Sequence, residues 1–116
     1  MTLDRVGDVL GTSGDLAGAT QCFKESLGIM RRLAEMDADD THYQRDLAVS
    51  LGKTGDIFIK SDVLAEAKQH YEESLGIMRQ LAGEYPDYIE WQQDLLLCLK
   101  RTGDALKKSD DLDGAA

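Results

Sequence analysis

The sequence predicts an all-α protein, an α-solenoid in which antiparallel helix hairpins stack side by side. Three observations predict this fold. A unit of 48 residues recurs along the chain of 116 residues, and the apolar residues within each unit follow a helical spacing. The chain also contains one proline and 6% aromatic residues, a composition unlike that of a β-sandwich. The length suits a single domain, and 42% hydrophobic residues suffice for a core.

The repeat is clearest in one heptapeptide. Residues 25–31, ESLGIMR, recur as residues 73–79, a shift of 48 positions. When residues 1–68 are laid over residues 49–116 without a gap, 30 of the 68 pairs are identical. We therefore expect a single helical-repeat domain over residues 1–116. Its parts are a partial first repeat (1–38), a complete middle repeat (39–86) and a truncated third repeat (87–116).

The first two helices are expected at residues 2–12 and 16–37, with Gly14 at the reversal between them. Glycine adopts the left-handed conformation that such a reversal requires without a steric penalty. The helix over 16–37 carries an apolar stripe whose members step by three or four positions. This stripe consists of Leu16, Ala19, Phe23, Leu27, Met30 and Leu33.

The middle repeat is expected to contain helices at residues 41–60 and 63–85. Thr41, followed by Gln44 three positions later, resembles a capping box at the start of the first of these helices. Asp62 occupies the reversal between them, where it is tolerated but is a poorer choice than glycine. The second helix again carries a stripe, which consists of Leu64, Ala67, Tyr71, Leu75, Met78, Leu81 and Tyr85.

The third repeat is expected to begin with a helix at residues 88–109. Pro86 ends the preceding helix, and Asp87, with a glutamate three positions later, resembles a second capping box. Asp110 stands at the next reversal, so a further helix is expected to begin at residues 111–116. The chain is thus expected to contain about five helices and the start of a sixth.

Each unit resembles the tetratricopeptide repeat, whose pattern is W-x₂-L-G-x₂-Y, then A-x₃-F, then a proline. The middle unit has Leu51-x₂-Thr54-Gly55-x₂-Phe58 and Ala67-x₃-Tyr71. The outer units have Leu3-x₂-Val6-Gly7-x₂-Leu10 with Ala19-x₃-Phe23, and Leu99-x₂-Thr102-Gly103-x₂-Leu106. The resemblance implies a right-handed superhelix whose first helices line a concave groove for a partner protein.

The chain departs from the tetratricopeptide pattern in two ways. Arg79 occupies the place of the closing proline, and the unit has 48 residues instead of about 34. The additional length amounts to about four helical turns, which divide readily between the two helices. The chain is therefore similar to the long-helix variants of the family, such as the extended repeats of kinesin light chains.

Charge and hydropathy argue against two classes of partner. Lys+Arg 13 against Asp+Glu 22 gives a net charge of −9, so nucleic-acid binding is not expected. Membrane insertion is not expected either, because the longest apolar run, residues 95–99, falls far short of the roughly 20 residues that span a bilayer. Residues 1–5 do not resemble a secretory signal. Cys22 and Cys98 lack metal-type spacing and suit free thiols, so we expect a cytoplasmic protein.

No catalytic, cofactor or metal site is expected. Residues 51–54, LGKT, resemble the end of a phosphate-binding loop, but the first glycine of that motif is missing and the stretch lies mid-helix. His42 and His70 lie in different helices without a second histidine at metal-ligand spacing, so we interpret them as surface or half-buried residues. Met30 and Met78 recur within the apolar stripes and are interpreted as core residues.

An acidic residue follows the packing glycine in all three copies, at Asp8, Asp56 and Asp104. In the tetratricopeptide family this position faces the groove, although the chain has no Asn and so lacks the Lys–Asn clamp of the best-known groove. The groove residues implied by the resemblance are Asp8, Thr12, Val49, Asp56, Lys60, Leu97, Asp104, Lys107 and Lys108. Alternatively, Asp56 with Lys60 and Asp104 with Lys108 are i,i+4 pairs worth about 0.2–0.5 kcal/mol each. The two interpretations are compatible.

We expect a protein–protein interaction scaffold that binds a peptide or partner helix, rather than an enzyme. The alternative is a structural spacer or self-association segment of a larger repeat protein. Five consecutive apolar residues at 95–99 cover more than one face of the last full helix, and no capping helix follows it in the sequence. Self-association through Leu96, Leu97 and Leu106 is therefore also expected. A third possibility, part of an enzyme, has no residues to support it.

Overall fold

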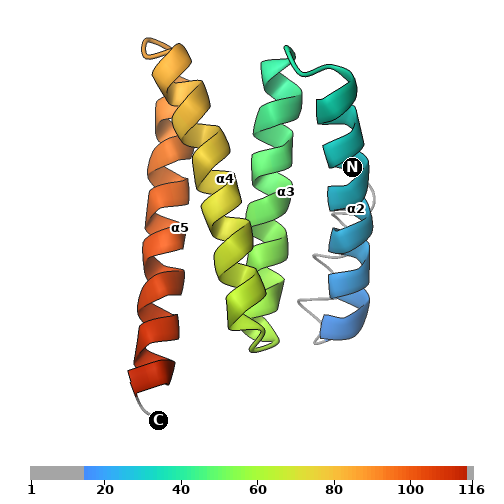
Figure 1. Ribbon diagram of the computed structural model, residues 1–116, viewed down its shortest axis with the longest axis vertical. Coiled ribbons are helices and arrows are strands. Elements are labelled where there is room, and N and C mark those ends of the chain that lie inside the picture. The colour runs from blue at the N-terminus through green and yellow to red at the C-terminus, as the bar shows by residue number, and fades with distance from the viewer. Residues whose placement is uncertain (1–14, 115–116) are drawn as a thin grey trace.

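The computed structural model describes residues 15–114, with side chains to residue 108. In this range the chain forms four α-helices and no strand. They run antiparallel to their neighbours and lie side by side in chain order (Figure 1). The all-α prediction is therefore confirmed for this range. The helices are α2 (Leu16–Met36), α3 (Thr41–Lys60), α4 (Leu64–Glu84) and α5 (Ile89–Gly114).

Three of the helix predictions agree with the structure to within a residue at each end. The helices α2, α3 and α4 correspond to those expected at 16–37, 41–60 and 63–85. The helix expected at 2–12 and the reversal at Gly14 lie outside the described residues.

The predicted reversal at Asp62 is confirmed, and the prediction of a reversal at Asp110 is wrong. Asp62 has φ of 61°, the left-handed conformation that the sequence predicts there. At Asp110 the backbone remains helical and α5 continues to Gly114, so residues 111–114 begin no sixth helix. A left-handed residue other than glycine costs roughly 1–2 kcal/mol. At Asp62 the packing of α4 on α3 offsets that cost, whereas no later helix packs back on α5 in the described part of the chain.

The helix α3 is capped by Asp40 rather than by Thr41. The Asp40 carboxylate accepts hydrogen bonds from the backbone N–H groups of His42 at 2.9 Å and Tyr43 at 3.3 Å. Gln44 makes no capping-box contact, because its amide reaches back to the carbonyl oxygen of Ala34 at 3.4 Å.

The amide of Gln44 has a counterpart one repeat later. Gln92 donates to the carbonyl oxygens of Ala82 at 2.9 Å and Pro86 at 3.3 Å. Gln44 donates to the corresponding carbonyl oxygens of the preceding repeat, at Ala34 and Ala38. Each glutamine thus ties the first helix of a hairpin to the end of the helix before it, and fixes the connection between repeats.

The core consists of apolar side chains that repeat from unit to unit. Met30 and Met78, which the sequence places in the core, are 6% and 1% exposed. Between α2 and α3 the buried cluster contains Leu27, Met30, Ala34, Leu47 and Leu51. Where α3, α4 and α5 meet, it contains Ala48, Met78, Leu81, Ala82 and Trp91.

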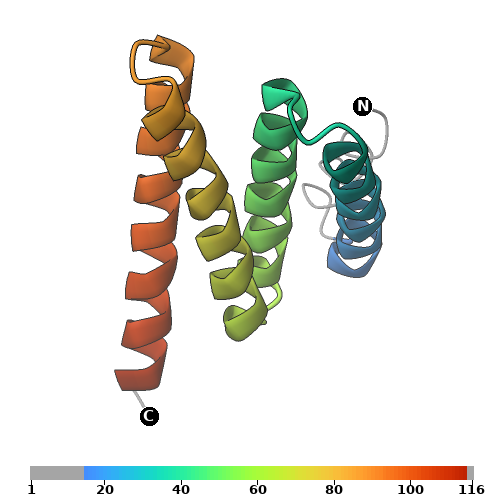
Figure 2. The same ribbon diagram turned by 45° about the horizontal axis from the view of Figure 1, so that its top comes forward.

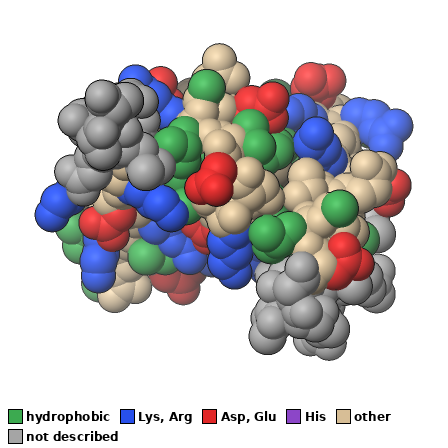
Figure 3. Space-filling model, turned by 90° about the horizontal axis from the view of Figure 1, so that it is seen from below, with side chains coloured by type: hydrophobic (Ala, Val, Ile, Leu, Met, Phe, Trp, Pro, Cys, Tyr) green, Lys and Arg blue, Asp and Glu red, His purple; other side chains and the backbone are tan. Residues whose placement is uncertain are grey.

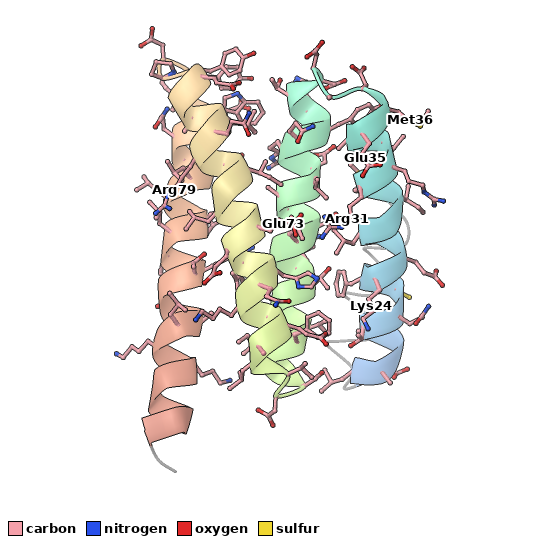
Figure 4. All side chains as sticks on the ribbon, viewed as in Figure 1. Lys24, Arg31, Glu35, Met36, Glu73 and Arg79 are labelled. Carbon is pink, nitrogen blue, oxygen red and sulfur yellow. The ribbon has the colours of Figure 1, made fainter. Side chains whose placement is uncertain are left out.

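An ion pair joins the two second helices, α2 and α4, across α3. Arg31 and Glu73 point toward one another (Figure 4), and the Arg31 Nη2 donates to a Glu73 carboxylate oxygen at 2.9 Å. Hydrogen bonding to Arg31 holds the pKa of Glu73 below its ordinary value, against the opposing effect of partial burial. Both side chains are about two-fifths exposed, so the pair contributes little stability.

The helix α4 holds α3 and α5 apart. It packs extensively against both, whereas α3 and α5 contact each other only slightly. In the view of Figure 2, α4 passes in front of the space between α3 and α5. A hollow between α3 and α5 therefore has α4 as its floor.

The helices α3 and α4 approach each other closely at Gly55. A Cβ atom built on Gly55 would lie 3.1 Å from the Tyr71 Cζ atom, whereas one built on Gly76 would have no neighbour within 4 Å. We expect Gly55→Leu to lower the free energy of unfolding by about 1–3 kcal/mol, because added bulk forces α3 and α4 apart. Gly76→Leu, the matched control, should be neutral or stabilising, since leucine favours a helix. Urea unfolding followed by circular dichroism measures both; equal stability of the two variants would contradict this crossing.

Candidate functional site

A groove lies between α3 and α5, with α4 as its floor. Its central part, which we call the central groove, is a cavity of about 160 Å³. All three helices contribute small or apolar side chains to it. These are Ala48, Val49 and Gly52 from α3, Tyr71, Ser74 and Met78 from α4, and Leu97, Cys98 and Thr102 from α5.

Charged side chains surround the central groove. Arg45, Lys53, Arg101 and Asp94 line it, three basic residues against one acidic residue. The Arg45 Nε donates to the Asp94 carboxylate at 3.1 Å, which links α3 to α5. The Arg101 Nη1 lies 3.3 Å from the position of a Cβ on Gly52, so the absence of a side chain there leaves room for the guanidinium. The groove thus carries an excess of positive charge in a chain of net charge −9.

A second cavity of about 200 Å³ adjoins the central groove. Tyr71 and Arg101 line both cavities, and the Tyr71 hydroxyl donates a hydrogen bond to the Asp56 carboxylate. Asp104 and Lys108 line the far side of this second cavity. The lower end of the molecule presents interspersed acidic, basic and hydrophobic side chains (Figure 3).

The groove residues implied by the family resemblance fall into three groups. Val49 and Leu97 line the central groove. Asp56, Asp104 and Lys108 line the adjoining cavity. Lys60 and Lys107 are exposed and line neither, while Asp8 and Thr12 lie outside the described residues.

The alternative interpretation of the acidic residues, as i,i+4 ion pairs, is wrong for these side chains. Among the described residues, ion pairs join Arg31 to Glu73 and Arg45 to Asp46 and Asp94. Neither Asp56 with Lys60 nor Asp104 with Lys108 comes within ion-pair distance. Asp56 accepts from Tyr71 instead, because the close approach at Gly55 brings the phenol to α3.

Sequence reasoning missed all four charged residues of the central groove, Arg45, Lys53, Asp94 and Arg101. One signal for them was present: Arg5, Lys53 and Arg101 stand at the same repeat position, 48 residues apart. A basic residue thus recurs in all three copies, and two of these residues line the groove. No such signal exists for Arg45 with Asp94, since they are 49 positions apart and occupy different repeat positions.

One buried hydroxyl in the groove wall lacks a hydrogen-bond partner. Thr102 is only 6% exposed, and its Oγ1 is buried without a hydrogen-bond partner among the described residues. The equivalent Thr54 Oγ1 donates to the Ser50 carbonyl oxygen at 2.8 Å. On the groove floor, the Ser74 Oγ donates to the Ala48 carbonyl oxygen at 2.7 Å, which binds α4 closely to α3.

Outside the groove the described side chains offer little chemistry. No group of three or more His, Cys, Asp or Glu among them could hold a metal ion, and none of the described helices is long and apolar enough to cross a membrane. His42 is exposed and lies edge-on to Trp91, and His70 is half-buried against Phe58, as the sequence predicts. A further cavity of about 350 Å³ lies between the α2–α3 connection and the end of α4.

The ionisation of Tyr71, on the groove floor, is expected to make the stability of the fold depend on pH in the alkaline range. Burial, and then the hydrogen bond to Asp56, raise the pKa of Tyr71 above its ordinary value of 10.0. The native state therefore resists ionisation of this phenol, and its contribution to stability is present below pH 10 and lost as the pH rises further.

We expect Tyr71→Phe, which introduces the residue found at the equivalent Phe23, to abolish this alkaline loss. Wild type should lose more unfolding free energy than the variant between about pH 8 and pH 11. Tyr88→Phe controls for the number of tyrosines, since Tyr88 is exposed. Identical pH profiles for wild type and Tyr71→Phe would contradict the assignment.

The two equivalent threonines should respond in opposite directions to valine. Thr102→Val removes a buried hydroxyl without a partner and should raise the free energy of unfolding by about 1 kcal/mol. Thr54→Val removes a paired hydroxyl and should lower it by about 1 kcal/mol. Urea titrations with circular dichroism compare them, and a loss of stability in both variants would show that Thr102 is hydrogen-bonded in solution.

Comparisons of this chain with protein-family models, with curated proteins and with solved structures find no match. The internal repeat and the groove are therefore the two features of the molecule that point to a function. The repeat places the first helices of consecutive hairpins on the same side of α4, and the groove lies between them.

Proposed function

We propose that this chain is a protein-interaction module, an α-solenoid of the tetratricopeptide type that binds a peptide or partner helix. The partner occupies the concave groove between α3 and α5. The observation that carries this proposal is the central groove itself: an apolar hollow between the first helices of two consecutive hairpins, surrounded by basic side chains. The proposal assigns no catalysis to the chain.

The size of the central groove suits one side chain of a partner. A cavity of about 160 Å³ is comparable to the roughly 150 Å³ apolar cavities that hold a benzene molecule. Ala48 in its α3 wall and Met78 in its floor are both 1% exposed. A leucine, methionine or aromatic side chain inserted there would bury its surface against side chains that are already fixed by the core.

The charges beside the hollow favour an acidic partner. Lys53 and Arg101 stand on opposite walls, on α3 and α5, while the pair of Arg45 with Asp94 bridges the walls. An acidic residue next to the anchoring side chain would meet the Arg101 guanidinium. Complementary charge of this kind raises the association rate and selects the register of the partner.

A selection from a random peptide display library tests the proposal. Enriched peptides should carry an apolar or aromatic residue adjacent to Asp or Glu. Leu97→Glu should weaken their binding at least about tenfold, which corresponds to about 1.4 kcal/mol. Leu96→Glu is the matched control, because this neighbouring leucine is more exposed (67% against 48%) and does not line the groove.

Two results would contradict the groove as the binding site. One is the failure of any peptide to enrich, and the other is binding that Leu97→Glu and Leu96→Glu weaken equally. Arg101→Gln should further reduce the salt dependence of binding, since one screened charge contact is removed.

The alternative function, a structural spacer or self-association segment, is favoured by the apolar residues that α5 exposes away from the groove. Leu96 and Leu99 are 67% and 40% exposed. If the chain served only to join repeats or copies, the variants at these two positions would alter its association state. Variants in the groove would then change nothing.

A further inference from the structure

The outer face of α5 is apolar and mostly exposed, with Leu106 half-buried. Leu96, Leu99, Gly103 and Leu106 follow one another at spacings of three and four residues, so they share one side of the helix. Leu96 is 67% exposed and Leu99 is 40% exposed. Gly103 is also exposed, and a Cβ atom built on it would meet nothing within 4 Å. These four residues define the outer face, and none of them lines the groove.

The same face is covered one repeat earlier. The equivalent residues of α3, displaced by 48 positions, are Ala48, Leu51, Gly55 and Phe58. All four are buried. The helix α4 packs over Ala48, Gly55 and Phe58, whereas Leu51 packs in the cluster between α2 and α3. The structure therefore contains an example of what this face accepts.

The packing of α4 on α3 shows which residues a covering helix needs. Tyr71 of α4 lies flat against Gly55, with its ring 3.1 Å from the position of a Cβ atom. Ala67, one turn earlier, packs in the same cluster as Phe58, and Ser74 bonds to the backbone of Ala48. A covering helix thus presents a small residue, then an aromatic residue four positions later, then another small residue. Gly103 leaves an open slot for the aromatic residue.

The outer face differs from its counterpart in charge. Lys100 and Lys107 are exposed where α3 has Gly52 and Ile59, so two ammonium groups flank the apolar residues. Leu96 is also larger than the equivalent Ala48, so the covering helix needs a small residue opposite Leu96. These differences favour a covering helix with acidic residues at its edges.

We propose that the outer face of α5 docks an acidic amphipathic helix of the α4 type, with an aromatic side chain in the slot at Gly103. This surface is additional to the central groove and does not depend on it. A second α5 from another copy fits less well. Two such faces would oppose lysines to lysines, and each chain carries a net charge of −9.

A labelled peptide with the sequence of residues 64–84 is the probe. It has the small–aromatic–small spacing and four glutamates against one lysine and one arginine. When the peptide is titrated with the full chain, its fluorescence anisotropy should rise to a plateau and give a Kd of about 100 μM. The affinity is modest because the isolated helix must become ordered on binding. Higher salt should weaken binding further.

Two glycine variants form the matched pair. Gly103→Leu fills the slot and should weaken binding at least about tenfold, while the fold is retained because the added side chain has open space. Gly76→Leu, at an exposed glycine of α4 with the same open surroundings, should bind like wild type. A peptide with Ala at the Tyr71 position should bind as weakly as Gly103→Leu does.

Every other outcome overturns the proposal. Absence of saturable binding up to about 1 mM, or binding that Gly103→Leu leaves unchanged, excludes this surface as the docking site. Loss of binding in Leu97→Glu alone would place the peptide in the central groove, which leaves the proposed function intact. Sedimentation that shows a dimer of the chain, dissociated by Gly103→Leu, would identify a second copy as the occupant instead.

Discussion

The close crossing of α3 and α4 at Gly55 is the constraint on which the rest of the structure depends. Because Gly55 has no side chain, the Tyr71 ring approaches the α3 backbone and its hydroxyl reaches Asp56. The same approach lets Ser74 bond directly to the Ala48 carbonyl oxygen. With α4 fixed this closely to α3, its other side is available to α5. The depth and floor of the groove follow from that arrangement.

Identical residues in successive repeats have different surroundings, because the neighbouring helix decides what each one contacts. Gly55 is buried and Gly103 is exposed. The Ser74 hydroxyl is paired, whereas that of Ser26 is buried without a partner among the described residues. A repeat therefore specifies its helices locally but depends on the adjacent repeat for its hydrogen bonds and its burial.

This distinction explains what could be predicted from the sequence. The helices α2, α3 and α4 could be predicted, since each carries its own apolar stripe, and so could the left-handed Asp62. The end of α5 could not, because Asp110 follows the same Lys-Ser pair as Asp62, yet the backbone stays helical there. Likewise, Asp40 and Thr41 are both good capping residues, and the sequence pattern alone does not distinguish between them.

The groove was predictable to the extent that it follows the repeat. Val49 and Leu97 stand at the same repeat position and face each other across it. The pairing of Arg45 with Asp94 crosses repeat positions and depends on the offset between α3 and α5, which only packing sets. The net charge of −9 was also a poor guide to this surface, because three of the basic residues, Arg45, Lys53 and Arg101, line the hollow against one acidic residue.

The helix α5 contributes residues to both proposed surfaces, because successive residues of a helix point in different directions. Leu96 and Leu97 are neighbours in the chain, yet about 100° of rotation separates them on a helix. Leu97 therefore lines the groove while Leu96 lies on the outer face. A run of five apolar residues at 95–99 exceeds the width of one buried stripe. Here the run faces three directions: Leu95 packs against the core, Leu97 faces the groove, and Leu96 with Leu99 lies on the outer face. Cys98 contacts the core cluster and also lines the groove.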